Sequence, residues 1–269
     1  MSWPKTRNPV AVVTGGSSGI GAETCRALLQ RGCSVYAISR RGQAPEGAVA
    51  LSADVTDEAG IRAAVETVTE QAGRIDILIN NAGFGISGAA EFTDNADAKR
   101  LLEADLFGVV NLTKAVLPVM RRQGGGRIVN VSSVAAPIAI PFQAWYSAAK
   151  AAVSAYSDAV QGEVRPFGIT VCTVQPGDIR TGFTAAREKK HVGDDVYGGR
   201  IGRSVAVMEK DEQNGMDPAA AGEAIAKAAL RGRAKPVTVI GGKYRLFVFL
   251  LRLLPRGFVR KVVDGMYGK

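Results

Sequence analysis

The stretch VAVVTGGSSGIG, residues 10–21, decides the fold. Its apolar start predicts a buried strand over residues 10–13, and a helix is expected over residues 19–31. The glycines between them remove the Cβ atoms that would keep a backbone turn away from a ligand. The first amides of a helix have no partner inside it and favour an anion. We therefore predict a turn that binds phosphate; a glycine-rich turn that only packs tightly is the alternative.

Short apolar runs alternate with longer helical patterns along the rest of the chain. Strands are expected at residues 34–39, 49–52, 75–79, 127–131, 169–174 and 237–240. Helices are expected up to residue 72 after a cap at Thr56 or Asp57, and at residues 97–123, 145–164 and 217–230. Apolar strands that alternate with helices are typical of a parallel sheet covered on both faces. We predict one α/β domain over residues 1–269, a Rossmann-like doubly wound sheet of about seven strands.

Composition excludes several other classes of protein. With 46% apolar and 22% charged residues, the chain is expected to be neither disordered nor a disulfide scaffold. Cys25, Cys33 and Cys172 cannot all pair and show no metal-site spacing, which favours a reducing compartment. The single histidine, His191, argues against a Ser-His-Asp hydrolase, and no metal site is expected. The first nine residues lack the apolar core of a signal peptide, so we expect a cytoplasmic location.

The net charge of +9 is concentrated toward the carboxyl end. No acid lies between Glu223 and Asp264, where the basic residues are Lys227, Arg231, Arg233, Lys235, Lys243, Arg245, Arg252, Arg256, Arg260 and Lys261. In the extension 243–269, the apolar run 246–251 is too short to span a bilayer, and Pro255 is expected to end its helix. The extension can pack on the body or a symmetry mate, lie on an anionic membrane, or line the entrance for a lipid-like substrate. No nucleic-acid motif accompanies the charge, so no nucleic acid is expected as a partner.

Two residues on the helix expected at 145–164 have the chemistry of a proton donor. Tyr146 and Lys150 are four positions apart, so their side chains leave the same face of the helix. A phenol with a pKa near 10 exchanges protons poorly at neutral pH unless a nearby cation favours the phenolate. Lys150 can supply that cation, which would make Tyr146 a general acid or base. An ordinary surface pair is the alternative.

The end of the second expected strand carries Ser39, Arg40 and Arg41, with no acid. In a dinucleotide-binding fold this position meets the adenosine ribose, where an acid binds free hydroxyls and an arginine binds a 2′-phosphate. Arg40 can hold that phosphate with charge-assisted hydrogen bonds. The sequence therefore predicts NADP(H) rather than NAD(H), unless both arginines are only solvated loop charges.

Motifs over residues 8–182 extend these features. The glycines follow a Gly-x3-Gly-x-Gly spacing after Thr14, and the further motifs are Asn80-Asn81-Ala82-Gly83, Asn130-Val131-Ser132-Ser133, Tyr146-x3-Lys150 and Pro176-Gly177. In this order and spacing they resemble the short-chain dehydrogenase/reductase family. The tail is similar to the apolar extensions of hydroxysteroid, retinol and sphingoid-base reductases in that family. Because such proteins are commonly dimers or tetramers, the resemblance implies a homodimer or homotetramer.

The resemblance also implies the remaining cofactor contacts. Asp54 and Val55 are expected beside the adenine, with Asn80, Ala82 and Gly83 beside the adjoining ribose. Near the nicotinamide we expect Ile179 and Thr181, together with Tyr146 and Lys150. The phosphate turn and the last motif complete the set with Gly15, Ser17, Ser18, Gly19, Ile20, Gly21, Pro176 and Gly177.

The catalytic roles are likewise implied by the resemblance. Ser133 should hydrogen-bond the substrate oxygen, because it precedes Tyr146 by the family's spacing, whereas its neighbour Ser132 does not. Tyr146 should transfer the proton, and Lys150 should hold the nicotinamide ribose. Asp105 stands where the family usually has an asparagine that supports a water relay through its main chain. A carboxylate at this position is able to pair with Lys150 and alter the titration of Tyr146.

The substrate is expected to be lipophilic and steroid-, retinoid- or lipid-like. Its pocket is assigned to Ser133, Ala135, Phe142, Tyr146 and Phe183, with further candidates at Phe84, Ile86, Ile138, Ile140, Gln143, Trp145 and Tyr197. The polar, glycine-dotted stretch 181–215 is expected to be a functional lid or disordered. The resemblance thus implies an NADP(H)-dependent enzyme that interconverts a carbonyl and a secondary alcohol. A 3-oxoacyl thioester reductase and a non-catalytic, membrane-docking nucleotide sensor are the alternatives.

Overall fold

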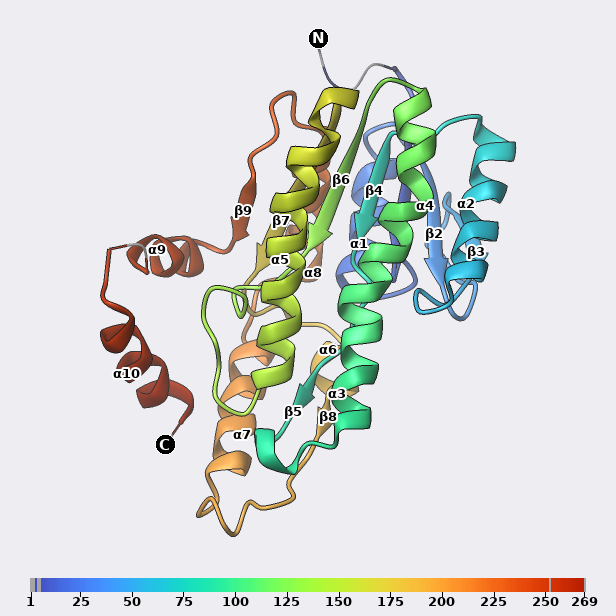
Figure 1. Ribbon diagram of the computed structural model, residues 1–269. Coiled ribbons are helices and arrows are strands. Elements are labelled where there is room, and N and C mark those ends of the chain that lie inside the picture. The colour runs from blue at the N-terminus through green and yellow to red at the C-terminus, as the bar shows by residue number, and fades with distance from the viewer. Residues whose placement is uncertain (1–2, 4–5, 252, 269) are drawn as a thin grey trace.

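The fold is organised around one parallel sheet. In the computed structural model, which describes residues 3, 6–251 and 253–268, the sheet has seven strands in the order β3-β2-β1-β4-β6-β7-β9, and all neighbours are parallel (Figure 1). The strands are β1 (Val10–Thr14), β2 (Ser34–Ser39), β3 (Val49–Ser52), β4 (Ile77–Asn80), β6 (Gly126–Val131), β7 (Ile169–Pro176) and β9 (Val237–Ile240). This confirms the predicted doubly wound, Rossmann-like class.

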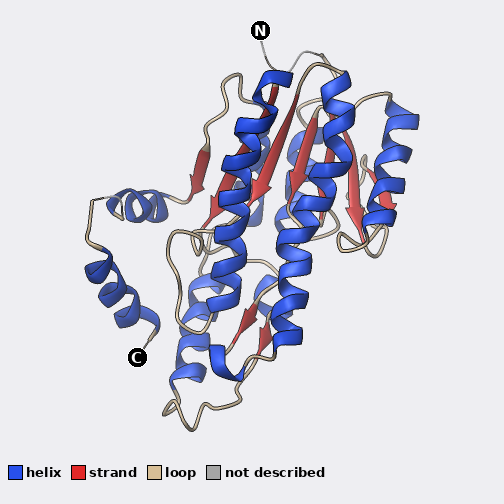
Figure 2. Ribbon diagram, in the orientation of Figure 1, coloured by secondary structure: helices blue, strands red, loops and turns tan. Residues whose placement is uncertain are grey.

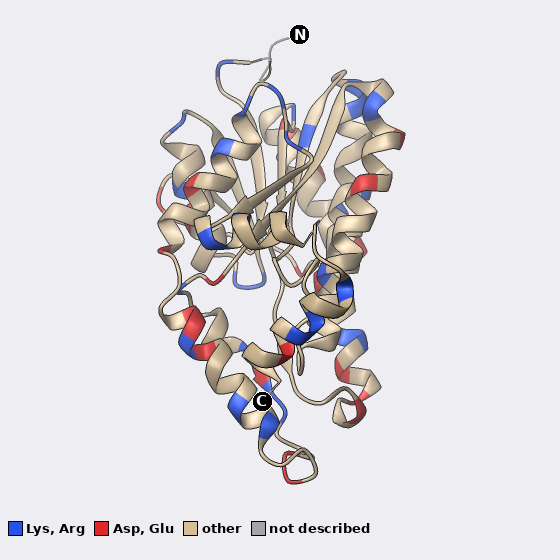
Figure 3. Ribbon diagram, turned by 90° about the vertical axis from the view of Figure 1, so that its left-hand side faces the viewer, with Lys and Arg blue, Asp and Glu red and all other residues tan. Residues whose placement is uncertain are grey.

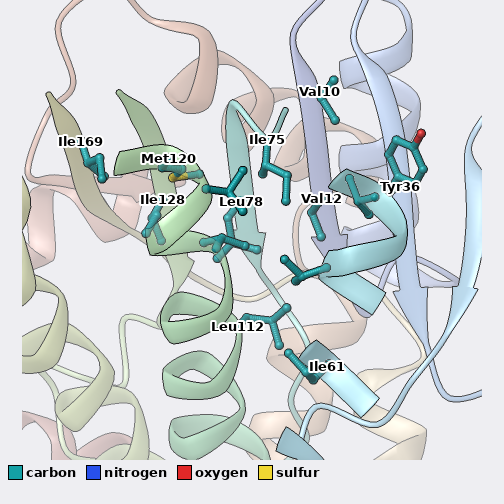
Figure 4. Packing of buried hydrophobic residues seen from close by; sticks show 14 of the residues in the cluster. Val10, Val12, Tyr36, Ile61, Ile75, Leu78, Leu112, Met120, Ile128 and Ile169 are labelled. Atoms are coloured by element: carbon teal, nitrogen blue, oxygen red, sulfur yellow. The ribbon is translucent and has the colours of Figure 1, made fainter. Parts of the chain in front are cut away.

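Helices cover both faces of the sheet (Figure 2). The helices α2 (Glu58–Ala72), α4 (Gly108–Arg122) and α5 (Ala144–Val164) cover one face, and α1 (Gly19–Leu29) and α8 (Pro218–Leu230) cover the other. Successive residues of a strand point to opposite faces. Val12 therefore packs in the cluster with Leu78 and Leu112 (Figure 4), whereas Val13 packs in the opposite cluster. With both faces buried, the open edge at the carboxyl ends of the strands is left for a ligand.

Short polar side chains start two of these helices. Asp57 caps α2 by accepting a hydrogen bond from the Ala59 amide at 3.1 Å, and Asp217 caps α8 by accepting from the Ala219 amide at 2.8 Å. Such a cap is worth about 1 kcal/mol. Of the two caps that the sequence allows for α2, the structure uses Asp57.

The long helix expected at residues 97–123 is interrupted. It consists of α3 (Asn95–Leu102), a π-helical turn (Glu103–Phe107) and α4. A π-helical turn inserts an extra residue, which changes the direction of the side chains around it, and such turns are frequent at functional sites. Here the turn carries Asp105, which is completely buried.

The polar segment 181–215 is folded into short elements. It contains α6 (Phe183–Ala186), β8 (Glu188–Lys189) and α7 (Arg200–Gln213), and β8 pairs with β5 (Ile86–Ser87) in a small separate sheet. The helix α7 was not predicted because its buried face includes Ser204 beside Ile201, Val205 and Met208, so its apolar stripe is weak. The segment therefore has regular structure, and its role as a lid stays a prediction.

The carboxyl-terminal extension forms the helices α9 (Gly242–Leu250) and α10 (Arg256–Tyr267) at the side of the molecule next to β9 (Figure 1). As expected, the first helix ends before Pro255. One side of the pair packs on Val134 and Ile138, and the Tyr267 hydroxyl donates a hydrogen bond to Asp211 of α7 at 3.2 Å. Arg252, one of the basic residues counted above, lies outside the described residues. No helix in the described part of the chain has the length and apolarity needed to cross a membrane.

Candidate active site

The phosphate turn is held in place by the end of β1. Thr14 accepts hydrogen bonds through Oγ1 from the amides of Asn81 and Ala82, at 2.9 and 3.0 Å. Gly15 has φ +66°, and a Cβ there would lie 2.9 Å from Asn81 Nδ2. A Cβ at Gly21 would overlap the Gly15 carbonyl oxygen. The turn is thus closed by backbone contacts that only glycine permits.

The amino end of α1 opens toward this turn. Among the described residues, the side chain of Ser18 at the start of α1 caps none of the first amides. Thr181 follows β7 in the chain and lies next to the start of α1. A Cβ built on Gly19 would lie 3.6 Å from Thr181 Cβ. An uncapped helix start offers N–H donors and a positive dipole end to an anion. The predicted phosphate-binding residues and Thr181 therefore share one site that fits a dinucleotide.

The residues assigned to the adenosine lie at the ends of β2 and β3. Arg40 and Arg41 are exposed, and neither forms an ion pair with any described residue. The Ser39 hydroxyl accepts a hydrogen bond from the Gln43 amide at 3.2 Å. Asp54 accepts through Oδ1 from the amide and hydroxyl of Thr56, both at 2.9 Å. The neighbouring Val55 uses its carbonyl oxygen to accept from Asn111 at 3.0 Å. Both arginines remain available for a phosphate group.

Asn80, assigned to the ribose, directs its side chain into the protein. Its Nδ2 donates to Asn130 Oδ1 at 2.8 Å, and Asn130 in turn donates to Ser157 Oγ at 2.8 Å. This chain of hydrogen bonds ties β4 to β6 and α5. A cofactor contact at Asn80 is therefore left to its main chain. Ala82 and Gly83 follow it at the open edge of the sheet.

The catalytic candidates converge between β6 and α5. The Ser133 side chain lies beside the Tyr146 phenol, whose pKa it lowers, and Lys150 Nζ lies 5.6 Å from the centre of the Tyr146 ring. Ser132 points elsewhere, because its hydroxyl donates to the Lys150 carbonyl at 2.9 Å and contacts Ser154. The two neighbouring serines thus have different contacts: Ser132 is bonded to the backbone of α5, and Ser133 lies beside the phenol.

Asp105 and Lys150 form a buried ion pair beside this group. The Asp105 Oδ2–Lys150 Nζ distance is 2.9 Å, and the two side chains are 0% and 7% exposed. The other carboxylate oxygen accepts from the Phe84 amide at 2.9 Å, while Lys150 also reaches the Val131 carbonyl at 3.4 Å. The contact between Asp105 and Lys150 that the sequence allowed is therefore present. Asp105 links Lys150 to the loop after β4.

Burial dominates the ionisation of these groups. It raises the pKa of Tyr146 above its ordinary value; Lys150 opposes this rise and Asp105 adds to it. Burial also raises the pKa of Asp105. For Lys150, burial favours the neutral amine, but the charges of Asp105 and Tyr146 outweigh it and raise the pKa. The sequence predicted that Lys150 would lower the pKa of Tyr146 toward neutral pH. Lys150 does lower this pKa, but burial raises it by more. The result is a protonated phenol beside an ammonium group.

The predicted substrate residues fall into two groups. Phe183 lies against Tyr146, with ring centres 5.8 Å apart, and the Ala135 amide donates to Ser133 Oγ at 3.1 Å. Phe142, with an uncommon φ of +59°, instead packs edge-on against Tyr197. Phe84, Ile86 and Trp145 cluster with Tyr146.

Two further pocket candidates lie away from Tyr146. Ile138 and Ile140 line a cavity of about 60 Å³ under α9 and α10. His191 is exposed on the loop before α7. The sequence motifs include Thr14 and Asn81 without assigning them a role, and the structure shows that they are hydrogen-bonded to each other beside the phosphate turn. Arg187, which no motif indicated, is buried next to Phe183.

Comparisons with known proteins agree with this geometry. A family model described as short chain dehydrogenase matches residues 9–192. The chain is 42% identical over 235 residues to the 3-ketodihydrosphingosine reductase of Bacteroides thetaiotaomicron, which covers 86% of this chain and 87% of that protein. It is 31% identical to dehydrogenase/reductase SDR family member 7B of Bos taurus, over 94% of this chain and 80% of that protein.

A solved structure shows the same arrangement. The short-chain dehydrogenase from Streptomyces avermitilis matches with a TM-score of 0.82 and 33% identity, over 96% of this chain and 98% of that one. Its match extends beyond the residues of the family model into the carboxyl-terminal part. Together with the phosphate turn and the Tyr146 centre, these similarities establish that the chain belongs to the short-chain dehydrogenase family of oxidoreductases, which use NAD(H) or NADP(H).

Proposed function

We propose that this protein uses NADPH to reduce a ketone on a long-chain lipophilic substrate to a secondary alcohol, and catalyses the reverse oxidation. The observation that carries the proposal is the placement of the Tyr146 phenol beside the Ser133 side chain, with Lys150 Nζ 5.6 Å from the centre of its ring. The similarity to a protein named 3-ketodihydrosphingosine reductase favours a lipid ketone over a sugar or small acid.

Each catalytic residue has a separate role in the proposed reduction. When bound, the reduced nicotinamide supplies a hydride to the carbonyl carbon. Ser133 donates a hydrogen bond to the carbonyl oxygen, and Tyr146 gives its proton to that oxygen as negative charge develops there. Lys150 stabilises the phenolate left on Tyr146 and holds the nicotinamide ribose. Asp105 positions Lys150 through their ion pair. The raised pKa of Tyr146 supports this direction, because it keeps the donated proton on the phenol at neutral pH.

NADP(H) is the proposed cofactor because of Arg40. Its exposed guanidinium has no ionic partner among the described residues, and no acid stands in the stretch Ser39–Arg41 to repel a 2′-phosphate. Replacing Arg40 by Asp should lower kcat/KM with NADPH by at least about tenfold and reverse the preference toward NADH, since a charge-assisted hydrogen bond becomes a repulsion. Arg62→Asp, a charge change on α2, is the matched control. A ratio of kcat/KM values that is unchanged in Arg40→Asp would rule out the phosphate role.

The substrate class is tested by comparing the rates of NADPH consumption with several classes of carbonyl compound. We expect long-chain ketones with a free hydrocarbon tail to be reduced faster than steroids, retinals or 3-oxoacyl thioesters. Fastest turnover of the 3-oxoacyl thioester would favour the alternative reductase. Tight NADPH binding without turnover of any compound would favour a nucleotide sensor.

The extension is proposed to rest on an anionic membrane surface, where such a substrate is found. While Tyr244, Phe247, Val259 and Val263 pack inward, a second set of large apolar side chains on α9, α10 and their connection is 49–67% exposed: Leu246, Phe249, Leu253, Phe258 and Met266. Exposed basic residues lie beside them on α9 and α10 (Figure 3), namely Lys243, Arg245, Arg256, Arg260 and Lys261. Apolar side chains enter the interface and basic ones meet the headgroups. A homodimer or homotetramer in the cytoplasm is compatible with this placement.

A further inference from the structure

We propose that Arg187 forms a substrate subsite which binds an uncharged oxygen, that of a hydroxyl group near the reacting ketone. The inference rests on the proposed function and narrows the substrate to long-chain hydroxyketones. It concerns a residue that follows α6, away from the catalytic motif of α5.

Arg187 is buried with part of its hydrogen-bonding capacity unused. The side chain is 1% exposed, and Nη2 pairs with Glu212, itself 13% exposed. Nε and Nη1 are buried and donate to no atom of the described residues. A guanidinium has five N–H donors, and burying donors without an acceptor is costly. Glu212 already balances the charge of Arg187, so these donors call for an acceptor rather than for a second negative charge.

The Arg187 guanidinium lies close to the catalytic centre. Arg187 Cζ is 5.5 Å from the centre of the Phe183 ring, and that ring is 5.8 Å from the Tyr146 ring. A Cβ on Gly85, in the loop after β4, would lie 3.6 Å from Arg187 Nε and 2.9 Å from Phe183 Cζ. The guanidinium charge also acts on Tyr146, whose pKa it lowers against the larger effect of burial. Thr184 and Ala185 of α6 line an open cleft together with Glu212, the partner of Arg187.

The backbone around Arg187 is held firmly. The Glu188 amide donates to the Gly85 carbonyl at 3.0 Å, and β8 pairs with β5 directly after it. Arg100 binds both oxygens of Glu188, at 2.8 and 2.7 Å. A donor fixed in this way loses little freedom when it binds an acceptor, which suits recognition of one substrate group.

The experiment compares two ketones of equal chain length, one with a hydroxyl on a carbon near the ketone and one without it. For the wild type we expect kcat/KM to favour the hydroxyketone by at least about tenfold, because a site built to bind a hydroxyl rejects the analogue that lacks it. The test variant is Arg187→Met combined with Glu212→Gln, which leaves no buried charge unpaired. It should reduce the plain ketone within about threefold of the wild type and lose the preference, mainly through KM.

Two further results separate the subsite from a structural role and from the proposed function. Arg100→Gln loosens the same β5–β8 support and should leave the preference for the hydroxyketone intact. A wild type without that preference, or a double variant that keeps it, would overturn the subsite while turnover of the plain ketone upholds the reductase. An equal loss with both ketones in the double variant would show that Arg187 is only structural. If the wild type reduces neither ketone, the proposed function and the subsite fail together.

Discussion

The catalytic centre buries charged side chains, whereas the extension exposes apolar ones. Around Tyr146, the charges of Asp105 and Lys150 are buried and paired with each other. On α9, the side chains of Leu246 and Phe249 are apolar yet 60% and 56% exposed. Natural proteins seldom leave a cluster of large apolar side chains uncovered without a partner. On the proposed function, the catalytic chemistry is assembled within one chain, whereas we propose that a surface outside the chain covers the extension.

Reversing the charge of the extension should give the largest effect outside the catalytic centre. The triple variant Arg256→Glu, Arg260→Glu and Lys261→Glu should bind vesicles rich in anionic lipid at least about 100-fold more weakly, because each basic residue near such a surface contributes about 1 kcal/mol. Co-sedimentation with vesicles of anionic and of zwitterionic lipid measures this. NADPH binding should not change, since the helix α10 lies outside the catalytic centre.

The control carries the same change of net charge on the body, with Lys99, Arg121 and Arg122 each replaced by Glu. Equal vesicle binding by both triple variants would contradict the membrane assignment. If the wild type does not bind vesicles and dimerises through Leu246 and Phe249, a second copy of the chain covers the extension instead.

The contact between α9 and the segment after β7 is expected to make the free energy of unfolding depend on pH. Tyr244 of α9 donates a hydrogen bond to Asp178, which follows β7, and its ring lies against Gly177. Burial raises the pKa of Asp178 from 3.8 to about 6, and nearby Asp211 and Glu212 add to the rise. Between pH 3.8 and about 6, the folded state thus holds a proton that the unfolded state releases. Stability is highest below pH 3.8 on this account and falls as the pH rises to about 6.

Asp178→Asn should remove that loss. An amide oxygen still accepts from Tyr244 but carries no charge, so the variant should exceed the wild type by about 2 kcal/mol in free energy of unfolding at pH 7.5. The difference should shrink toward pH 4. Urea unfolding at the two pH values measures it. A constant difference, or a less stable variant at pH 7.5, would show that Asp178 does not carry this charge penalty.

Asp105→Asn should give a smaller effect, confined to the catalytic centre. Removing the carboxylate takes away a charge that raises the pKa of Tyr146, so the phenol should lose its proton at lower pH. The alkaline limb of kcat for ketone reduction should move to lower pH, with a loss of about tenfold or less at pH 7 because Tyr146 itself remains. Glu103→Gln, an exposed change on the same π-helical turn, should leave the profile unchanged. An unshifted limb in Asp105→Asn would remove Asp105 from the proton relay.

Sequence alone located the features that depend on local spacing. The strand, glycine turn and helix at residues 10–29 are adjacent in the chain, and Tyr146 and Lys150 share one helical turn. Such patterns are visible without a structure because their chemistry needs fixed separations. The side-chain roles in catalysis and cofactor binding remain predictions.

Features that depend on distant contacts were not predictable. The contact of Tyr244 with Gly177 joins residues far apart in sequence, and Arg187 is one arginine in a polar stretch with no spacing signal. The π-helical turn has no sequence signal of its own, because its one buried residue is the acid Asp105. Tertiary packing determines all three features: the Tyr244–Gly177 contact, the burial of Arg187 and the π-helical turn at Asp105.

The most direct test of the central claim is ketone reduction by Tyr146→Phe. The substitution keeps the ring against Phe183 and removes only the hydroxyl that lies beside Ser133. We predict that NADPH binding stays within about twofold, while kcat with a long-chain ketone falls by about 10³-fold, since general acid catalysis contributes 10²–10⁴-fold. Turnover by Tyr146→Phe within tenfold of the wild type would contradict the assignment of this phenol as the proton donor.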